Sequence, residues 1–188
     1  MTLSIRNAAP GEYPALLDLV LAAYGDIGFL ESDPGFEAEV IGLMESPHTQ
    51  VIVAELEGVP AGTITFYPDG RFYDDAHVPS GWSCLRTLAV RPSAQGRGAG
   101  RALMNECLRR ARALGRSRML LHTHKSMTGA VRLHESLGFE RAPELDLFYS
   151  PDLTFIAYVQ DLWLQGGLHG HRRDHEDHHH GFDPAEQE

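Results

Sequence analysis

The residues with the clearest chemical potential form a glycine-rich turn near the middle of the chain. The run reads LRTLAVRPSAQGRGAGRAL, and in it Gly96, Gly98 and Gly100 alternate after an apolar stretch and a proline. Glycine lets backbone amides come close to a ligand because no Cβ is in the way. A helix that starts here adds unsatisfied N–H groups and a partial positive charge. Since Arg97 and Arg101 could contact the same anion, the turn predicts a polyphosphate site.

Two commoner phosphate-binding motifs are excluded at this turn. A Walker loop ends in Gly-Lys followed by Ser or Thr, and that sequence does not occur here. A dinucleotide fingerprint places its third glycine three residues after the second, where this chain has Arg101. The alternative that the residues alone leave open is a tight connection without a ligand.

Hydrophobic periodicity and turn residues predict strands and helices that alternate around this turn. The predicted strands cover residues 3–7, 51–56, 61–67, 82–90, 119–123 and 155–159, and the predicted helices cover 14–24, 34–44, 98–114 and 128–137. The run EGVP between the second and third strands favours a hairpin. Alternation of this kind is typical of an α/β domain, and the hairpin implies a mixed sheet.

Two segments, in this order, are similar to motifs of the GNAT N-acetyltransferases. Gln95-x-x-Gly98-x-Gly100 resembles the pyrophosphate loop of that superfamily, and AVRLHESLGF at 130–139 resembles its A-x-x-L-Y-x-x-x-G-F segment. The resemblance implies an α/β domain over residues 1–164, with a mixed, mostly antiparallel sheet, a splayed parallel strand pair and flanking helices. It also implies an acyltransferase, an N-acetyltransferase that uses acetyl-CoA as co-substrate.

The resemblance further implies where acetyl-CoA binds. The pantetheine arm would lie between the splayed strands, against backbone groups of Leu88, Ala89 and Val90. The pyrophosphate would be held by the turn, which consists of Gln95, Gly96, Arg97, Gly98, Ala99, Gly100 and Arg101. An amine would attack the thioester carbonyl directly in a ternary complex. A backbone N–H near Leu88 would stabilise the developing oxyanion.

The residues that would deprotonate the amine depart from the family pattern. Cys84 and Arg86 occupy strand positions where various members of the family keep a glutamate. The base must then come from elsewhere, or water must relay the proton. Asp74, Asp75 and His77, in the loop before that strand, are our candidate bases.

His134 stands where the family usually has a tyrosine that protonates the leaving thiolate. A histidine can donate a proton, so His134 is our candidate acid, and a partly buried packing residue is the alternative. Met127 replaces an asparagine that contacts pantetheine in many members. We interpret His122 and His124, at the end of a strand beside the cleft, as structural or supporting residues.

Charge falls into three blocks along the chain. Residues 1–80 carry 2 Lys/Arg and 13 Asp/Glu, residues 81–141 carry 12 and 3, and residues 142–188 carry 2 and 10. A general nucleic-acid binder is more basic overall. The basic block suits a ligand with several phosphates, and the acidic blocks suit a cationic partner. We therefore expect a small cationic molecule with a primary amine as acceptor and no nucleic-acid partner. An N-terminus or a lysine side chain of a protein is the alternative acceptor.

The loops around the cleft are expected to form the acceptor pocket. The three candidate segments are 25–36, 69–81 and 142–152. Within them, Glu31, Asp33 and Asp74 are predicted to line the path by which the amine approaches. A catalytically weak acyl-CoA-binding regulatory module is the alternative function, because both the strand glutamate and the tyrosine are replaced.

The remaining features concern location and the end of the chain. No apolar run is long enough for a membrane span or a signal peptide, and two cysteines do not form a disulfide framework, so we expect a cytoplasmic protein. Homodimerisation is common in the family, and no residue here decides it. Residues 165–188 hold six of the eleven histidines and many charges, which predicts a flexible acidic tail. The tail could hold a transition metal loosely, but the simpler interpretation is a solvated segment without a metal site.

Overall fold

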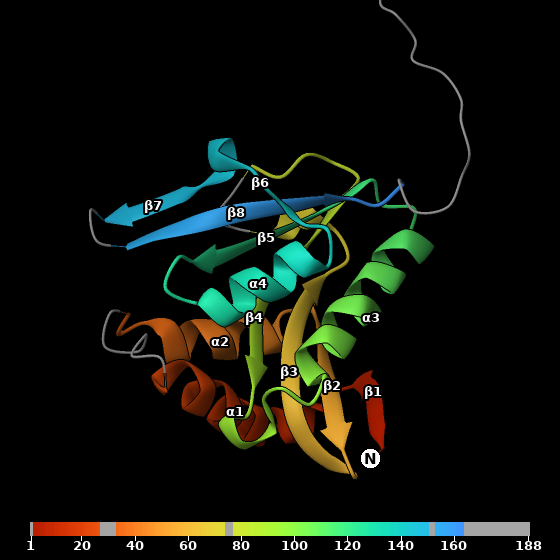
Figure 1. The fold of residues 1–188 in the computed structure, drawn as a ribbon, viewed down its shortest axis with the longest axis vertical. Coiled ribbons are helices and arrows are strands. Elements are labelled where there is room, and N and C mark those ends of the chain that lie inside the picture. The colour runs from red at the N-terminus through yellow and green to blue at the C-terminus, as the bar shows by residue number, and fades with distance from the viewer. Residues whose placement is uncertain (1, 27–32, 74–76, 151–152, 164–188) are drawn as a thin grey trace, which may run out of the picture.

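The computed structural model describes residues 2–26, 33–73, 77–150 and 153–163, which form one mixed sheet with helices on both faces (Figure 1). The strands are β1 Leu3–Asn7, β2 Gln50–Leu56, β3 Val59–Tyr67, β4 Trp82–Val90, β5 Arg118–His124, β6 Glu140–Arg141, β7 Leu147–Ser150 and β8 Leu153–Asp161. The helices are α1 Tyr13–Gly25, α2 Phe36–Glu45, α3 Ala99–Ala113 and α4 Thr128–Ser136. The sheet order is β1-β2-β3-β4-β5-β8-β6, with β7 also on β8. Every pairing is antiparallel except β4 with β5.

The two faces of the sheet are covered by different helices because side chains alternate along each strand. Ile52 and Ala54 of β2 belong to the core that holds the apolar stripe of α3. Val51 and Val53, their neighbours on the same strand, pack with α1 and α2. The stripe of α3 that faces the sheet consists of Leu103, Met104, Cys107, Leu108 and Ala111, all buried. The 3.6-residue period read from the sequence therefore places α3 correctly.

The hairpin between β2 and β3 is a two-residue turn of the kind that matches strand twist. Glu57 and Gly58 both have positive φ, 51° and 78°. Two-residue hairpin turns with positive φ at both positions suit the right-handed twist of the strands, and glycine adopts that conformation without strain. The predicted hairpin is thus present, but its turn is two residues shorter than predicted because β3 begins at Val59.

The expected fold class is confirmed, and two short strands were missed. β7 forms inside the segment 142–152, which was predicted only as a substrate loop, and β6 lies just before that segment, at Glu140–Arg141. Both are short, and both depend on pairing with β8, which begins two residues earlier than predicted. Pairing with a distant strand is not visible in a local pattern. The predicted tail over 165–188 lies outside the described residues.

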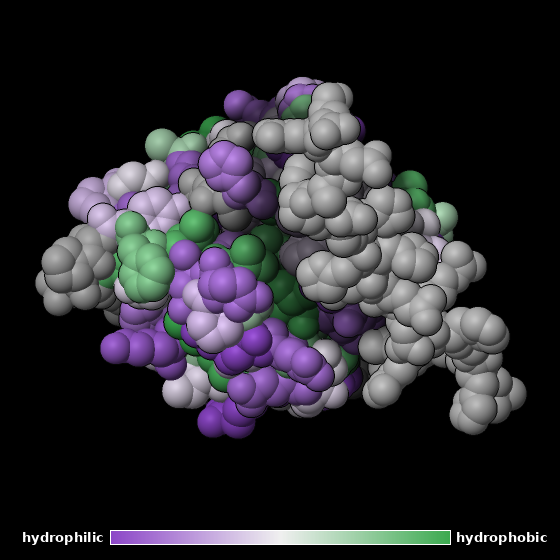
Figure 2. Space-filling model, turned by 90° about the horizontal axis from the view of Figure 1, so that it is seen from above, coloured by the Kyte–Doolittle hydropathy of each residue, from purple (hydrophilic) through white to green (hydrophobic). Residues whose placement is uncertain are grey.

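The described helices are too short or too polar for any of them to cross a membrane. The end of the molecule that carries β6, β7 and β8 shows a central apolar area with hydrophilic side chains around it (Figure 2). Groups of three or more His, Cys, Asp or Glu side chains suited to a metal ion do not occur within the described part of the chain.

Candidate active site

Two parallel strands separate in the middle of the sheet. Pairing of β4 with β5 runs from Trp82–Arg118 to Leu85–Leu121 and ends there. β4 continues to Val90 and β5 continues to His124. The strands therefore diverge over their C-terminal halves, and the cleft that the resemblance predicts lies between them. The splayed parallel pair is confirmed.

A β-bulge bends β4 within this cleft. Thr63 of β3 pairs with Ala89, but Thr65 pairs with Arg86, so two residues of β4 face one residue of β3. Thr87, in the bulge, has φ 55°. Bulges re-aim the groups of a strand and often lie next to active sites. Here the bulge sets the direction of Leu88, whose carbonyl oxygen accepts a hydrogen bond from the Tyr24 hydroxyl at 3.4 Å.

The glycines of the turn after β4 have two different physical roles. Gly96 and Gly98 have φ 73° and 90°, and a Cβ on either would meet no atom within 4 Å. Their amides thus border open space, and Gly98 caps α3 with no side-chain hydrogen bond to its first turn. At Gly100, by contrast, a Cβ would lie 3.3 Å from Leu133 Cδ2. Gly100 therefore permits close packing of α3 against α4, whereas the other two shape the turn.

The side chains of the turn lie around this helix start. Gln95 Nε2 donates to the carbonyl oxygen of Val90 at 3.5 Å, and Arg97 is exposed. The exposed Arg101 donates from Nη2 to Ser136 Oγ at 2.8 Å, at the end of α4. The basic side chains therefore flank the N-terminus of a 15-residue helix, which is an anion-binding arrangement.

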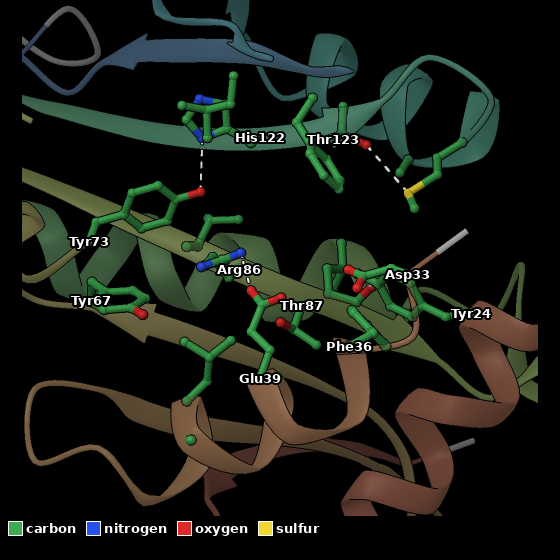
Figure 3. A pocket seen from close by; sticks show the side chains of 18 of the residues that line it. Tyr24, Asp33, Phe36, Glu39, Tyr67, Tyr73, Arg86, Thr87, His122 and Thr123 are labelled. Carbon is green, nitrogen blue, oxygen red and sulfur yellow. Dashed lines mark hydrogen bonds and ion pairs between the residues drawn. The ribbon is translucent and has the colours of Figure 1, made fainter. Parts of the chain in front are cut away.

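A cavity of about 610 Å³ opens beside the bulge (Figure 3). Its size falls in the range typical of small-molecule sites. Its walls come from α1, α2, the end of β3 and the segment after it, β4, β5, α4, β7 and β8. The polar or aromatic residues of these walls include Tyr24, Asp33, Phe36, Glu39, Tyr67, Tyr73, Arg86, Thr87, His122, Thr123 and His134. The bulge residues Thr87 and Leu88 belong to this wall, so β4 connects the cavity to the turn.

Opposite charges face each other in the cavity. The guanidinium of Arg86 forms an ion pair with Glu39 of α2. Its Cζ also lies 5.3 Å from the centre of the Tyr73 ring. Asp33 lines the same wall, as the sequence analysis predicted, whereas Glu31 lies outside the described residues. Among the described residues of its wall, the cavity thus presents the guanidinium of Arg86 and the carboxylates of Glu39 and Asp33.

Of the three candidate bases in the loop before β4, His77 is the one that lies within the described residues. His77 is exposed and is not among the residues that line the cavity. Asp74 and Asp75 lie outside the described residues. Cys84 is fully buried, and this burial raises the pKa of its thiol, so the thiol stays protonated.

His134 is buried and uncharged. It lies between Phe139 and Tyr158, with ring centroids 6.0 and 6.5 Å away, and only 3% of it is exposed. Its Nδ1 has no hydrogen-bond partner among the described residues. Burial lowers the pKa of His134 to about 4. The ring also borders the cavity, but at neutral pH it lacks the extra proton of a strong acid, which favours the packing alternative over the acid role.

The side chains that best combine acid–base chemistry with position are Tyr73, for which the sequence predicted no role, and His122, which was predicted to be only a structural or supporting residue. Tyr73 Oη lies 2.8 Å from His122 Nδ1, and both side chains line the cavity (Figure 3). The two residues are 49 positions apart, and a tyrosine in a polar loop carries no local signal. Met127 also contacts this region, where its sulfur lies 3.7 Å from Thr123 Oγ1.

The comparisons with known proteins agree with this geometry. A family profile described as the acetyltransferase (GNAT) family matches residues 13–139. The L-methionine sulfoximine/L-methionine sulfone acetyltransferase of Salmonella typhimurium is 31% identical over 116 residues, which cover 59% of this chain and 65% of that protein. The L-amino acid N-acyltransferase MnaT of Escherichia coli is 32% identical over 116 residues, which cover 59% and 64%. The matched part thus spans just under two thirds of both relatives.

Solved structures show the same fold at lower identity. A GNAT-family acetyltransferase from Staphylococcus aureus superposes with a TM-score of 0.68 at 15% identity, over 86% of this chain and 99% of that one. A GNAT-family acetyltransferase from Brucella melitensis, solved in complex with acetyl-CoA, gives 0.58 at 23%, over 83% and 86%. The chain belongs to the GNAT acetyltransferase family, because the family profile matches most of it and because it has the splayed strands and the glycine turn at the start of α3.

Proposed function

We propose that this protein is an acetyl-CoA-dependent N-acetyltransferase that transfers the acetyl group to the primary amine of a small molecule. The observation that carries the proposal is the course of β4. Its bulge borders the cavity, and its end leads through the glycine turn to the N-terminus of α3. One strand therefore connects an anion-binding turn with a pocket for a second reactant.

The turn fits the pyrophosphate of acetyl-CoA. Gly96 and Gly98 leave open the space that a Cβ would fill, and their conformations strain any other residue. The backbone amides from Gln95 to Gly100 would hold the phosphates, with Arg97 and Arg101 beside them. Backbone groups of Leu88, Ala89 and Val90 would bind the pantetheine arm. Several structures of similar fold contain acetyl-CoA, including those from Brucella melitensis and Salmonella typhimurium.

Direct attack by the amine is favoured over an acyl-cysteine intermediate. The chain has two cysteines, Cys84 and Cys107, and both are fully buried. Burial raises the pKa of both thiols. A cysteine nucleophile acts as the exposed thiolate, which neither residue can supply. The amine and acetyl-CoA must therefore be present together, so that the protein acts by orienting them and by stabilising the oxyanion.

The charges of the cavity favour an amine that also carries a carboxylate. Arg86 could bind a carboxylate, and Glu39 and Asp33 could bind an ammonium group. A free amino acid or a close derivative combines both groups. Two relatives are named as enzymes that act on amino acids or on methionine sulfoximine and sulfone. Amino acids are accordingly the acceptor class that we expect.

A turnover screen tests this function. The protein is incubated with acetyl-CoA and single amines, thiol release is followed, and products are identified by mass spectrometry. Each amino acid is paired with the amine that lacks its carboxylate. Amino acids are expected to react faster than their partners. Acetyl-CoA binding with no turnover across the panel would instead support a regulatory acyl-CoA-binding module.

A further inference from the structure

A tyrosine and a histidine meet where β4 and β5 begin to diverge. Pairing ends at Leu121, so His122 is the first residue of β5 beyond it, across from Arg86 on β4. Tyr73 directly follows the helical turn Gly70–Phe72. The two rings are nearly parallel, with centroids 5.6 Å apart and planes at 18°. Both side chains line the cavity, and Figure 3 shows the tyrosine hydroxyl directed at the histidine ring.

The second nitrogen of His122 fixes the tautomer of the ring. His122 Nε2 lies 2.8 Å from the carbonyl oxygen of Leu145, which can only accept a hydrogen bond. Nε2 therefore carries a proton. In the neutral ring Nδ1 is then an acceptor, and Tyr73 Oη, 2.8 Å away, donates to it. The histidine is thus oriented as a base, with its acceptor nitrogen toward the cavity.

Two ion pairs lie on the elements around His122, one between Asp146 and Arg141 and one between Glu39 and Arg86. The pKa of the Asp146 carboxyl lies below its ordinary value. Burial alone would raise this pKa, but hydrogen bonds from Arg141 and from the Ala157 amide, together with the charges of Arg141 and His122, lower it. A carboxylate therefore lies within electrostatic reach of the ring. On the cavity side, Arg86 stands over the Tyr73 ring, but Glu39 neutralises its charge.

We propose that Tyr73 and His122 form the proton relay for the acceptor amine, an inference that rests on the function proposed above. Tyr73 Oη accepts a proton from the substrate nitrogen while the hydroxyl proton of Tyr73 passes to His122 Nδ1. One N–H bond of the substrate breaks and an O–H bond forms. The original O–H bond breaks and an N–H bond forms at Nδ1. Tyr73 is unchanged, His122 becomes an imidazolium, and the substrate nitrogen keeps the electron pair with which it attacks the thioester.

The relay explains how the protein can have a general base although β4 carries Arg86 at a position where various family members keep a glutamate. The base comes from β5, the other strand of the diverging pair, and its contact with the substrate passes through Tyr73. Tyr73 is the catalytic residue, and His122 is the terminal proton acceptor that acts through it.

Kinetics of Tyr73→Phe and His122→Gln test the relay. Loss of general-base catalysis is expected to lower kcat roughly a hundredfold at pH 7. The KM for acetyl-CoA should stay unchanged, and both variants should regain activity at high pH, where the amine is already deprotonated in solution. His124→Gln is the matched control, because His124 lies on the same strand but bonds Ser126 Oγ at the surface, at 2.6 Å. A merely structural defect would not recover with pH.

Two tests could overturn the relay. If the wild-type protein turns over while His122→Gln keeps its kcat and its pH profile, the relay is wrong and the proposed function stands. The second test needs no turnover. ¹⁵N NMR of the histidine rings should show the Nε2–H tautomer for His122 and a shifted titration in Tyr73→Phe. An Nδ1–H tautomer, or a titration that Tyr73→Phe does not move, would overturn the relay even in a protein that transfers no acetyl group.

Discussion

The turn at the start of α3 and the cavity beside β5 are built in opposite ways. The turn is one continuous segment, and its shape comes from glycines with positive φ and from the backbone of a helix start. The cavity draws its walls from segments between Tyr24 and Phe155, and its character comes from charged and aromatic side chains. A backbone site recognises a group that all its ligands share, such as a pyrophosphate. A side-chain site can change its specificity while the fold remains.

The largest effect is expected on acetyl-CoA affinity, from a substitution in the glycine turn at the start of α3. Gly98→Trp fills the space in front of the helix N-terminus, and we expect at least a roughly hundredfold loss of acetyl-CoA affinity, about 3 kcal/mol. Gly115→Trp is the matched control, because Gly115 also has positive φ, 67°, and open space, but lies just beyond the other end of α3. Both variants should lose similar stability, roughly 1–2 kcal/mol for the forced left-handed conformation. Calorimetric titration and thermal unfolding measure the two effects, and equal loss of affinity in both would remove the special role of the turn.

The next largest effect is on the pH dependence of stability and comes from His134 of α4, the helix that borders both the turn and the cavity. The pKa of His134 is about 4 in the folded protein, against about 6.5 when unfolded, so the unfolded state binds more protons between these values. Stability should therefore fall as the pH drops from 6.5 to 4, by about 3 kcal/mol in total. His134→Leu should remove this contribution, and His124→Leu should leave it in place. Urea unfolding across this pH range provides the measurement, and a His134→Leu slope equal to that of the wild type would contradict the buried, neutral assignment.

A smaller effect is expected on the KM for the acceptor, from a substitution in the cavity. Glu39→Gln removes one carboxylate and the ion pair that this carboxylate forms with Arg86. We expect the KM for the acceptor to rise about tenfold, near 1.4 kcal/mol, with acetyl-CoA affinity unchanged. Glu37→Gln, on the exposed face of the same helix, is the control. If Glu39→Gln weakened acetyl-CoA binding instead, the separation of the two regions would be wrong.

The smallest effect belongs to a side chain at the turn. Arg101 is exposed and in this structure bonds Ser136, so its contribution to phosphate binding is modest. Arg101→Ala should weaken acetyl-CoA binding about fivefold at low salt, close to 1 kcal/mol, and less at high salt. Arg109→Ala, farther along α3 and paired with Glu106, should leave binding unaffected. If Arg101→Ala weakened acetyl-CoA binding equally at high salt, the side chain would act through a direct hydrogen bond rather than through its charge.

The same contrast explains what the sequence could predict. The turn, the stripe of α3 and the hairpin at Glu57 and Gly58 depend on neighbouring residues, and local patterns identify them. Asp33 could be anticipated from the acidic N-terminal block. Each of these features lies within a single segment, so its position follows from that segment alone.

The acceptor side could not be predicted in this way. The contact of Tyr73 with His122 and the ion pair of Arg86 with Glu39 join segments 49 and 47 positions apart. Neither appears in a pattern confined to one element. The short β6 and β7 exist only because β8 pairs with them. For His134, the residue type suggested an acid, but burial between two aromatic rings decides its charge.

The central claim is that both reactants are held together, one by the turn and one by the cavity. Initial rates measured with acetyl-CoA and an accepted amino acid, each varied at several fixed concentrations of the other, test it most directly. A ternary complex predicts reciprocal plots whose lines intersect, with Glu39→Gln changing only the constants for the amine. Parallel lines would show that the acetyl group is first transferred to the protein, which would contradict direct attack by the amine.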